Sequence, residues 1–156
     1  MQRLYGWGKK NSRVNAPAKD TRFERISVMG ALGLDGIRAP FTFDGTLNTE
    51  IFKPYVEQFL APAMKKDDIF ILDNCSVHKV KNSLKPLIDK GIIVLFLPPY
   101  SPDFNPIEMS WSKIKSYLRK VCAETKATLN DALVCAFDMF SKDEIINWFR
   151  HDGYLL

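Results

Sequence analysis

The stretch Ile69-Phe-Ile-Leu-Asp-Asn-Cys-Ser-Val-His-Lys79 decides how the middle of this chain folds. It opens with an apolar run that ends at Asp73, and such runs are typical of strands covered on both faces. A second run, Ile92-Ile-Val-Leu-Phe-Leu97, follows a segment that we predict to be helical from about Lys79 and to stop at Gly91. Strand, helix and strand then form a right-handed crossover with parallel strands. The carboxyl ends of the strands meet at one edge, where open α/β sheets place their sites.

A second acidic residue follows that edge. The loop Pro98-Pro-Tyr-Ser-Pro-Asp-Phe-Asn-Pro106 leads to Glu108, and 34 residues (108 − 73 − 1) separate it from Asp73. We expect Asn105 to cap the next helix and the following proline to take its first position. Taken locally, Glu108 could be only a capping-box glutamate, and Asp73 only a strand-end residue that bonds its own turn.

Two carboxylates at one edge need a counter-charge. At about 4 Å apart they repel by roughly 4 kcal/mol at an effective dielectric constant near 20. That is a large share of the roughly 5–15 kcal/mol that keeps a domain folded. A divalent cation would offset the repulsion, and oxygen ligands without cysteine or histidine spacing suit Mg²⁺ or Mn²⁺ more than zinc.

The two acidic stretches, Ile71–His78 and Leu97–Trp111, closely resemble the second and third acidic motifs of DDE transposases of the mariner-like group and their bacterial insertion-sequence relatives. The separation of Asp73 and Glu108 is also typical of that group. The resemblance implies an α/β fold of the ribonuclease-H-like kind, a mixed sheet flanked by helices. It also implies a transposase catalytic domain that cleaves DNA at transposon ends and joins the freed 3′-hydroxyl to target DNA.

The same resemblance assigns roles to individual residues. Asp73 would bridge two Mg²⁺ ions, with Mn²⁺ as an alternative, and Glu108 would hold one of them. The residues expected to contact DNA are Asn74, His78, Lys79, Asn105, Lys113, Lys115 and Arg119. A solvated face is the ordinary interpretation of such basic helix positions. The resemblance places His78 near the site, where it would contact DNA or orient the acid, whereas a lone histidine often has only a structural role.

The resemblance places a first catalytic aspartate on an opening strand, just before the segment that Tyr5–Lys10 resembles, and this chain begins after that point. Asp20, Asp35 and Asp44 come too late to replace it. We therefore expect residues 1–156 to be a single, N-terminally truncated DDE catalytic domain that lacks the first strand. An upstream transposase fragment would supply the aspartate.

Three other interpretations fit the sequence. The chain could be a nuclease of the same fold that joins no target strand, or a catalytically incomplete fragment that binds DNA or transposase subunits. It could also be a decayed reading frame with no selected role. The expected partners are the terminal repeats of the transposon, the target DNA and further copies of the chain, because transposases of this group usually act as dimers that hold two ends.

Composition narrows the class of protein. The chain has 156 residues, 46% of them hydrophobic, which suits one compact core. Its net charge of +4 permits contact with nucleic acid without requiring it. No apolar run reaches the roughly 18 residues of a membrane span, and the first residues lack a signal-peptide pattern. We expect a cytoplasmic, nucleoid-associated protein with no membrane partner.

The three cysteines, Cys75, Cys122 and Cys135, are odd in number and share no CxxC spacing. That pattern is typical of reduced thiols in the cytosol and implies neither a disulfide nor a zinc site. Cys75 follows Asp73 by two residues, but no companion base in a known pattern marks it as a nucleophile.

Short patterns predict the remaining elements. Ile26–Gly33 and Ile37–Phe43 flank an Asp-Gly turn and should form an antiparallel hairpin. Asn48 should cap a helix with one apolar stripe, in which Pro54 requires a late start or a kink and Pro62 ends the helix.

Both ends of the chain carry weaker signals. Residues 1–25 could hold a short strand followed by a polar loop. Two helices should close the chain, each opened by a capping-box pattern: Thr128–Phe140, opened by Thr128 and Asp131, and Ser141–Arg150, opened by Ser141 and Glu144.

Overall fold

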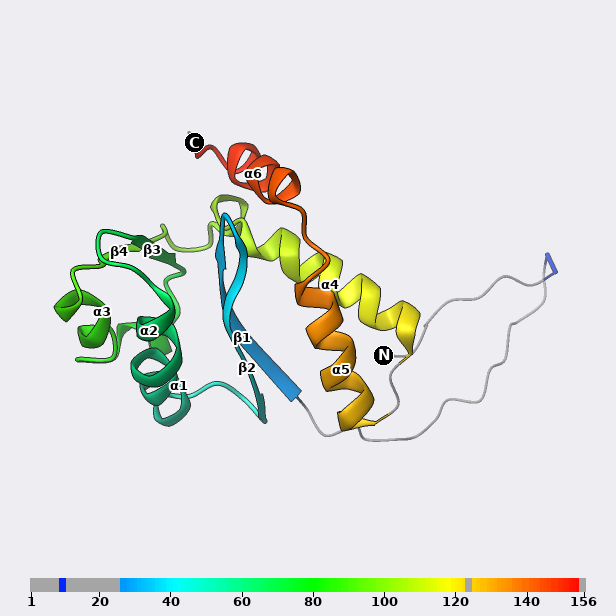
Figure 1. Cartoon of the computed structure of the whole chain (residues 1–156), viewed down its shortest axis with the longest axis horizontal. Helices are drawn as coiled ribbons and strands as arrows, with labels where there is room; N and C mark the ends of the chain where they lie inside the picture. Colours follow the sequence, from blue (N-terminus) through cyan, green and yellow to red (C-terminus); the bar gives the residue numbers. More distant parts are fainter. Residues whose placement is uncertain (1–8, 11–25, 123–124, 155–156) are drawn as a thin grey trace.

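The computed structural model describes residues 9–10, 26–122 and 125–154, so nearly all of the strand and loop expected in residues 1–25 falls outside the described residues. None of the helices among the described residues is both long enough and apolar enough to cross a membrane. The elements, shown in Figure 1, are β1 (Ile26–Gly33), β2 (Gly36–Asp44), α1 (Thr49–Tyr55), the π-helical turn η1 (Val56–Leu60), α2 (Ala61–Ala63), β3 (Ile69–Leu72), the 3-10 turn η2 (Ser76–Lys79), α3 (Lys85–Asp89), β4 (Ile93–Phe96), the 3-10 turn η3 (Pro102–Phe104), α4 (Ile107–Val121), α5 (Lys126–Phe137) and α6 (Lys142–His151).

Strands β1 and β2 form the predicted antiparallel hairpin. Its register shifts at Gly30, which faces both Ala39 and Pro40 on β2. A bulge is a place where a strand accommodates proline, because proline has no N–H to give to the ladder. At this bulge the Ala39 carbonyl accepts a 2.9 Å hydrogen bond from the hydroxyl of Tyr55. The irregularity in the strand therefore joins the hairpin to α1.

Helix α1 starts where its cap predicts. The side chain of Asn48 accepts a 3.0 Å hydrogen bond from a backbone N–H of the first turn. Pro54 does not delay the helix but lies inside it, where it removes one backbone donor. The turn that follows, Val56–Leu60, is π-helical, and both proline and π-helical turns are known places where helices bend. The helix runs through Pro62, so the predicted end at that residue is wrong.

Strands β3 and β4 are parallel, as predicted, so their carboxyl ends lie at the same edge. The segment between them differs from the prediction, because the 3-10 turn Ser76–Lys79 comes first and α3 begins only at Lys85. Pro86 explains the late start, since proline fits the first turn of a helix and disrupts its interior. Past the end of α3, as predicted, comes Gly91, with a φ of +81° that favours glycine.

The two parallel strands are less buried than their apolar sequence predicts. Ile69, Ile93 and Leu95 are 57%, 52% and 48% exposed, whereas Leu72 is 6% exposed. Each sheet in the described part of the chain has two strands, and Leu72 packs with residues of α1 and α2. Burial on both faces is therefore wrong for this pair, because one strand pair covers little of its own surface. The α/β class of the fold is as expected.

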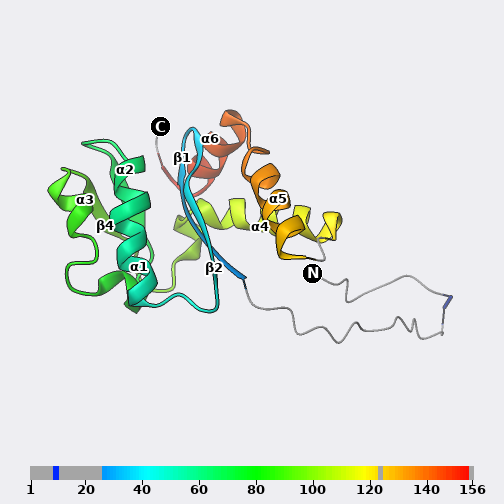
Figure 2. The same ribbon diagram turned by 60° about the horizontal axis from the view of Figure 1, so that its bottom comes forward.

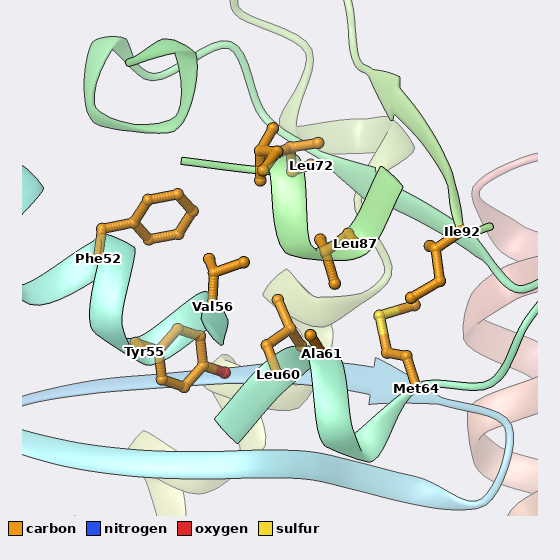
Figure 3. Packing of buried hydrophobic residues seen from close by; sticks show 10 residues of the cluster. Phe52, Tyr55, Val56, Leu60, Ala61, Met64, Leu72, Leu87 and Ile92 are labelled. Atoms are coloured by element: carbon orange, nitrogen blue, oxygen red, sulfur yellow. The ribbon is translucent and has the colours of Figure 1, made fainter. Parts of the chain in front are cut away.

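One hydrophobic core lies among α1, α2, α3 and the β3–β4 pair. Figure 3 shows its members Phe52, Tyr55, Val56, Leu60, Ala61, Met64, Leu72, Leu87 and Ile92. A second core contains Ile114 of α4 with Leu133 and Ala136 of α5. In both views the β1–β2 hairpin lies between the elements of the first core and helices α4 and α5 of the second (Figures 1 and 2). Met29 packs on the first core and Val28 on the second, since neighbouring strand residues point to opposite faces.

Lys90 ties the end of α3 to the end of α2. Its Nζ donates hydrogen bonds to the backbone carbonyls of Ala61 and Met64, at 2.7 and 2.6 Å. The last carbonyls of a helix have no partner within the helix, and a cation there also offsets the negative end of the helix dipole. This contact links two segments that are far apart in the sequence.

Helix α5 begins earlier than predicted. Thr125 is its N-cap, and it exchanges hydrogen bonds with Thr128 in a reciprocal capping box. The predicted box of Thr128 and Asp131 is therefore wrong, because a threonine three residues upstream offers the same chemistry. The helix also ends at Phe137, short of the predicted Phe140.

Helix α6 has the predicted N-cap residue, but only one of the two hydrogen bonds of the predicted capping box. Ser141 accepts a 3.2 Å hydrogen bond from the N–H of Glu144. The Glu144 carboxylate does not return a bond to the cap, because it binds Lys113 of α4 instead. A contact between distant helices thus replaces a local one.

Candidate functional site

Asp73 lies directly after β3, at the predicted carboxyl edge. Its Oδ1 accepts a 3.0 Å hydrogen bond from the backbone N–H of Cys75, the local turn contact that a strand-end aspartate makes. The side chain is nevertheless 58% exposed, and Oδ2 has no partner among the described residues. The carboxylate is therefore oriented by its own turn and open to a ligand.

The turn η2 folds His78 back towards the end of β3. Its Nε2 lies 3.3 Å from Oδ1 of Asp73, and the side chain is 18% exposed. The imidazole packs against Phe52, with ring centroids 4.5 Å apart. Burial lowers the pKa of His78 below its ordinary 6.5, and the charge of Asp73 only partly opposes that shift. His78 therefore lies beside the acid.

Cys75 completes a compact group with Asp73 and His78. One possible ligand atom from each of the three residues lies within 4.8 Å of the others. Spacing between cysteines did not indicate this group, because the other donors are a carboxylate and an imidazole. The available signal was the position of three different donors within six residues, at a strand end that has to turn.

Glu108 lies in the first turn of α4, but the cap of that helix differs from the prediction. Pro106 precedes the helix, and no side chain caps its first N–H groups. Asn105 accepts a 3.0 Å hydrogen bond from the Glu108 N–H through its carbonyl and not through its side chain. The predicted side-chain cap is wrong because the cap position falls one residue later, on a proline. The Glu108 carboxylate is exposed and makes no hydrogen bond or ion pair within the described ranges.

A cleft of about 700 Å³ lies between the two strand pairs, and both Asp73 and Glu108 line it. Strand β1 lines the cleft along Val28–Gly33, strand β3 along Ile69–Leu72, and the start of α4 contributes residues up to Trp111. In the described part of the chain β1 pairs only with β2, and β3 only with β4. The cleft therefore borders the unpaired edges of both strands.

Two of the predicted DNA-contacting residues, His78 and Asn105, line the cleft. The others lie outside it, within the residues that the structure describes: Asn74, which is half-buried, and Lys79, Lys115 and Arg119, which are exposed, together with Lys113.

Lys113 differs from the other basic residues of α4. Its Nζ donates to both carboxylate oxygens of Glu144, at 2.6 and 2.8 Å, and lies 5.4 Å from the centre of the Phe140 ring. Both partners of the ion pair are 33% exposed. Its charge is thus already paired within the protein, whereas Lys115 and Arg119 have no such partner among the residues that the structure describes.

Arg38 lines the cleft and was not predicted to do so. Its guanidinium binds both oxygens of Asp35, at 2.8 and 3.1 Å, and Oδ2 of Asp68, at 3.2 Å. The hydrogen bond from Arg38 is the main cause that lowers the pKa of Asp35 below its ordinary value. The Asp35–Arg38 spacing across a hairpin turn was visible in the sequence, whereas the contact with Asp68 was not.

Tyr154 also lines the cleft, beyond the end of α6. Its hydroxyl donates a 2.7 Å hydrogen bond to the carbonyl of Phe104, and its ring packs edge-on against Phe149, with centroids 5.6 Å apart. The end of the described chain is thereby attached to the loop that precedes Glu108. Nothing in the local sequence indicated this contact.

A family model described as DDE superfamily endonuclease matches residues 1–130. No curated protein matches the chain. Among the solved structures that resemble it, the Mos1 strand transfer complex has a TM-score of 0.74 and 17% identity, and the match covers 99% of this chain and 51% of that one. The Mos1 transposase paired-end complex with left transposon end has a TM-score of 0.70 and 17% identity, and the match covers 96% of this chain and 46% of that one. A pre-cleavage Mos1 transpososome has a TM-score of 0.63 and 14% identity, and the match covers 99% of this chain and 52% of that one. The likeness shows a shared fold, and this chain spans about half the length of the chains it matches.

Proposed function

Because this chain belongs to the DDE superfamily endonucleases, we propose that it is a transposase catalytic domain that cleaves DNA strands at transposon ends and transfers them to target DNA. The similar solved structures include a strand transfer complex and a complex of Mos1 transposase with a left transposon end. Those complexes support the choice of reaction and of DNA as partner. Residues 1–156 would act as one catalytic domain, on the nucleoid in the cytoplasm.

The observation that carries the proposal is the shared position of Asp73 and Glu108. They come from a strand end and from the first turn of a helix, and both line the cleft of about 700 Å³. Neither carboxylate is neutralised by a lysine or arginine in the described part of the chain. Exposed, uncompensated acids in one cleft are the arrangement that a bound cation would stabilise.

The donor set suits Mg²⁺, or Mn²⁺ in its place. Asp73 and Glu108 offer carboxylate oxygens, which are the ligands that such hard cations prefer. When bound, a pair of these ions activates an attacking oxygen and stabilises the leaving one during phosphoryl transfer. The protein would position the ligands, since the Cys75 N–H orients Asp73 and the first turn of α4 carries Glu108.

DNA would be held by residues around the cleft. Lys79, Lys115 and Arg119 are exposed, and cations of this kind bind the phosphate backbone without reading the sequence. His78 and Asn105 line the cleft itself, so they would contact DNA close to the scissile bond. Asn74, next to Asp73, would act at the same edge.

A further carboxylate would complete the metal site. Within the described ranges the one group of three or more possible ligands around Asp73 includes Cys75 and His78 but no second acid. The cleft runs between the unpaired edges of β1 and β3, where an added strand could pair with backbone groups on both sides. An upstream transposase fragment that contributes a strand and an aspartate would fit there. A second copy of the chain would hold the other transposon end.

The lack of a second acid in that group also favours one alternative. The chain could be catalytically incomplete by itself and bind DNA or transposase subunits without cutting. The two proposals differ in a single property, strand cleavage in the presence of a divalent cation.

The test is nicking of a supercoiled plasmid that carries the transposon ends, with Mg²⁺ or Mn²⁺. It would compare the chain alone with the chain plus the polypeptide encoded immediately upstream. Asp73→Asn and Glu108→Gln should each abolish nicking and leave DNA binding nearly unchanged, because backbone attraction does not depend on these acids. Asp89→Asn and Asp103→Asn, which change acids outside the cleft, are the matched controls.

Each outcome decides between the proposals. Cleavage that needs both acids supports the transposase domain. Salt-sensitive DNA binding without cleavage in any mixture supports the non-catalytic alternative. Cleavage that survives in both variants, with the controls behaving like the wild type, would refute the assignment of Asp73 and Glu108.

A further inference from the structure

We propose that Asp73, Cys75 and His78 form a binding site for a thiophilic divalent cation such as Zn²⁺. Such a site goes beyond the proposed function, because DNA cleavage requires only oxygen ligands. It also departs from the cysteine spacing, which implied no zinc site. The three residues carry the proposal through their geometry and their chemistry.

The geometry begins with the contact between His78 and Asp73. Nε2 of His78 lies 3.3 Å from Oδ1 of Asp73, slightly longer than a typical N–H···O hydrogen bond. Two ligand atoms that each lie about 2.0–2.1 Å from a tetrahedral zinc ion are roughly 3.3 Å apart. The nitrogen and the oxygen are therefore already separated as two ligands of one ion would be.

Cys75 supplies the third donor. Its ligand atom lies within 4.8 Å of those of Asp73 and His78. A thiolate bound at about 2.3 Å would lie roughly 3.5 Å from the other two ligand atoms, so the sulfur has to approach by no more than roughly 1.3 Å from a separation within 4.8 Å. Cys75 is exposed, and its side chain can make that approach without disturbing the core.

The chemistry of the donors selects the class of cation. One thiolate, one imidazole and one carboxylate are the ligand types of zinc sites, and three protein ligands leave a fourth position for water. Mg²⁺ prefers oxygen ligands and does not favour sulfur. On binding, the bond from sulfur to the metal forms and the thiol proton leaves to solvent.

The proposed site shares Asp73 and His78 with the cleft. A zinc ion held there would occupy a carboxylate that the proposed cleavage reaction needs for Mg²⁺. Zinc would then act as an inhibitor of strand cleavage. The site itself is testable on the purified chain without any DNA reaction, so the failure of one proposal is distinguishable from the failure of the other.

The experiment is titration of the full chain with Co²⁺, a coloured substitute for zinc, under reducing conditions. Absorption reports a thiolate-to-cobalt charge-transfer band when a cysteine binds the ion. We expect the band to saturate at one ion per chain, to disappear on addition of Zn²⁺ and to withstand an excess of Mg²⁺. Calorimetry with Zn²⁺ would give the affinity of the same site.

Four variants locate the site. Cys75→Ser should abolish the band, and His78→Gln should weaken Zn²⁺ binding by about tenfold or more, which is about 1.4 kcal/mol or more. Cys135→Ser and Cys122→Ser change the other two cysteines of the chain and should bind as the wild type does. Circular dichroism of each variant shows that it is folded.

The proposal would be overturned by three results. One is a wild-type chain that shows no charge-transfer band. Another is a band that persists in Cys75→Ser or vanishes in Cys135→Ser or Cys122→Ser. The third is saturation at one ion per two chains, which would place the site between copies.

Discussion

The hydroxyl of Tyr154 donates a 2.7 Å hydrogen bond to the backbone carbonyl of Phe104, 50 residues earlier in the chain. Phe104 belongs to the loop that leads to Glu108, so this bond attaches the residues after α6 to the loop that positions a proposed metal ligand. Burial raises the pKa of Tyr154, and the nearby charge of Asp152 adds to the shift. The neutral, donating form of the phenol is therefore favoured.

Removing this hydroxyl should loosen the loop. Tyr154→Phe is expected to lower the free energy of unfolding by about 0.5–1.5 kcal/mol, the usual net contribution of one such hydrogen bond. Urea unfolding followed by tryptophan fluorescence measures the change. Tyr100→Phe is the matched control, because Tyr100 is fully exposed. Equal effects of the two substitutions would mean that the bond to Phe104 contributes nothing.

Lys90→Met should destabilise the part of the protein around the first core, because it removes hydrogen bonds between the end of α3 and the end of α2. Methionine keeps most of the length of the side chain but cannot donate to the carbonyls of Ala61 and Met64. We expect a loss of about 1–3 kcal/mol, because hydrogen bonds from a charged donor are stronger than neutral ones. Chemical denaturation measures it, with exposed Lys81 changed to methionine as the control. An unchanged midpoint in Lys90→Met would show that water replaces the lysine at no cost.

Leu87→Ala tests the first core itself. Leu87 has 0% of its surface exposed, so truncation removes apolar contacts and leaves a cavity. The expected loss is about 2–5 kcal/mol. Val134→Ala, at a residue that is 61% exposed, should change stability far less. Differential scanning calorimetry of both variants gives the comparison, and similar melting temperatures would contradict the assigned core.

The Asp35–Arg38 pair should contribute a pH-dependent share of stability. The pKa of Asp35 is lowered from 3.8, chiefly by its hydrogen bond with Arg38, so the unfolded chain binds this proton more readily than the folded chain. The contribution is therefore present above about pH 3.8 and lost as the pH falls through the lowered pKa. The difference in unfolding free energy between wild type and Asp35→Asn should be constant near pH 7 and shrink as the pH falls below about 4. Asp89→Asn, at an exposed acid, serves as the control, and a difference that grows in acid would reverse the assignment.

Binding of DNA should distinguish the basic residues of α4. Each lost phosphate contact lowers the slope of log affinity against log salt by about 0.9. Lys115→Gln and Arg119→Gln should show this change, because both side chains are exposed. Lys113→Gln should show less, because Glu144 already pairs with Lys113. Fluorescence anisotropy across a range of salt concentrations measures the slopes, and three equal slopes would mean that the ion pair opens on DNA.

Patterns within a few residues were predicted well. Asn48 and Ser141 cap their helices, Gly91 follows α3, and Asp73 lies at the end of a strand. The errors at Asn105 and at Thr128 concern which of several capable residues makes a cap. Asn, Ser and Thr side chains all cap helices well, so the preference of one residue does not decide which of several neighbours makes the cap.

Burial was predicted less well than secondary structure. Ile93 and Leu95 have the apolar character of a buried strand, yet 52% and 48% of their residue surfaces are exposed. The apolar residues of a strand show which side chains favour burial. How far they are buried depends on the elements that pack against the strand. Lys113 is a similar case. Its neighbours in the sequence did not indicate that it forms an ion pair with Glu144, 31 residues later.

The sequence by itself determined the order of the main elements and the separation of Asp73 and Glu108, because these depend on periodicity, caps and turns among near neighbours. The resemblance to the family rested on the residues of the two acidic motifs themselves. Only the tertiary structure decided that both acids line one cleft, that Cys75 and His78 turn back towards Asp73, and that Tyr154 binds the loop before Glu108. Those relationships join segments through packing and through the angle of a single turn. Local sequence preferences specify neither the packing nor the angle of the turn, because many arrangements of the same elements have the same periodicity.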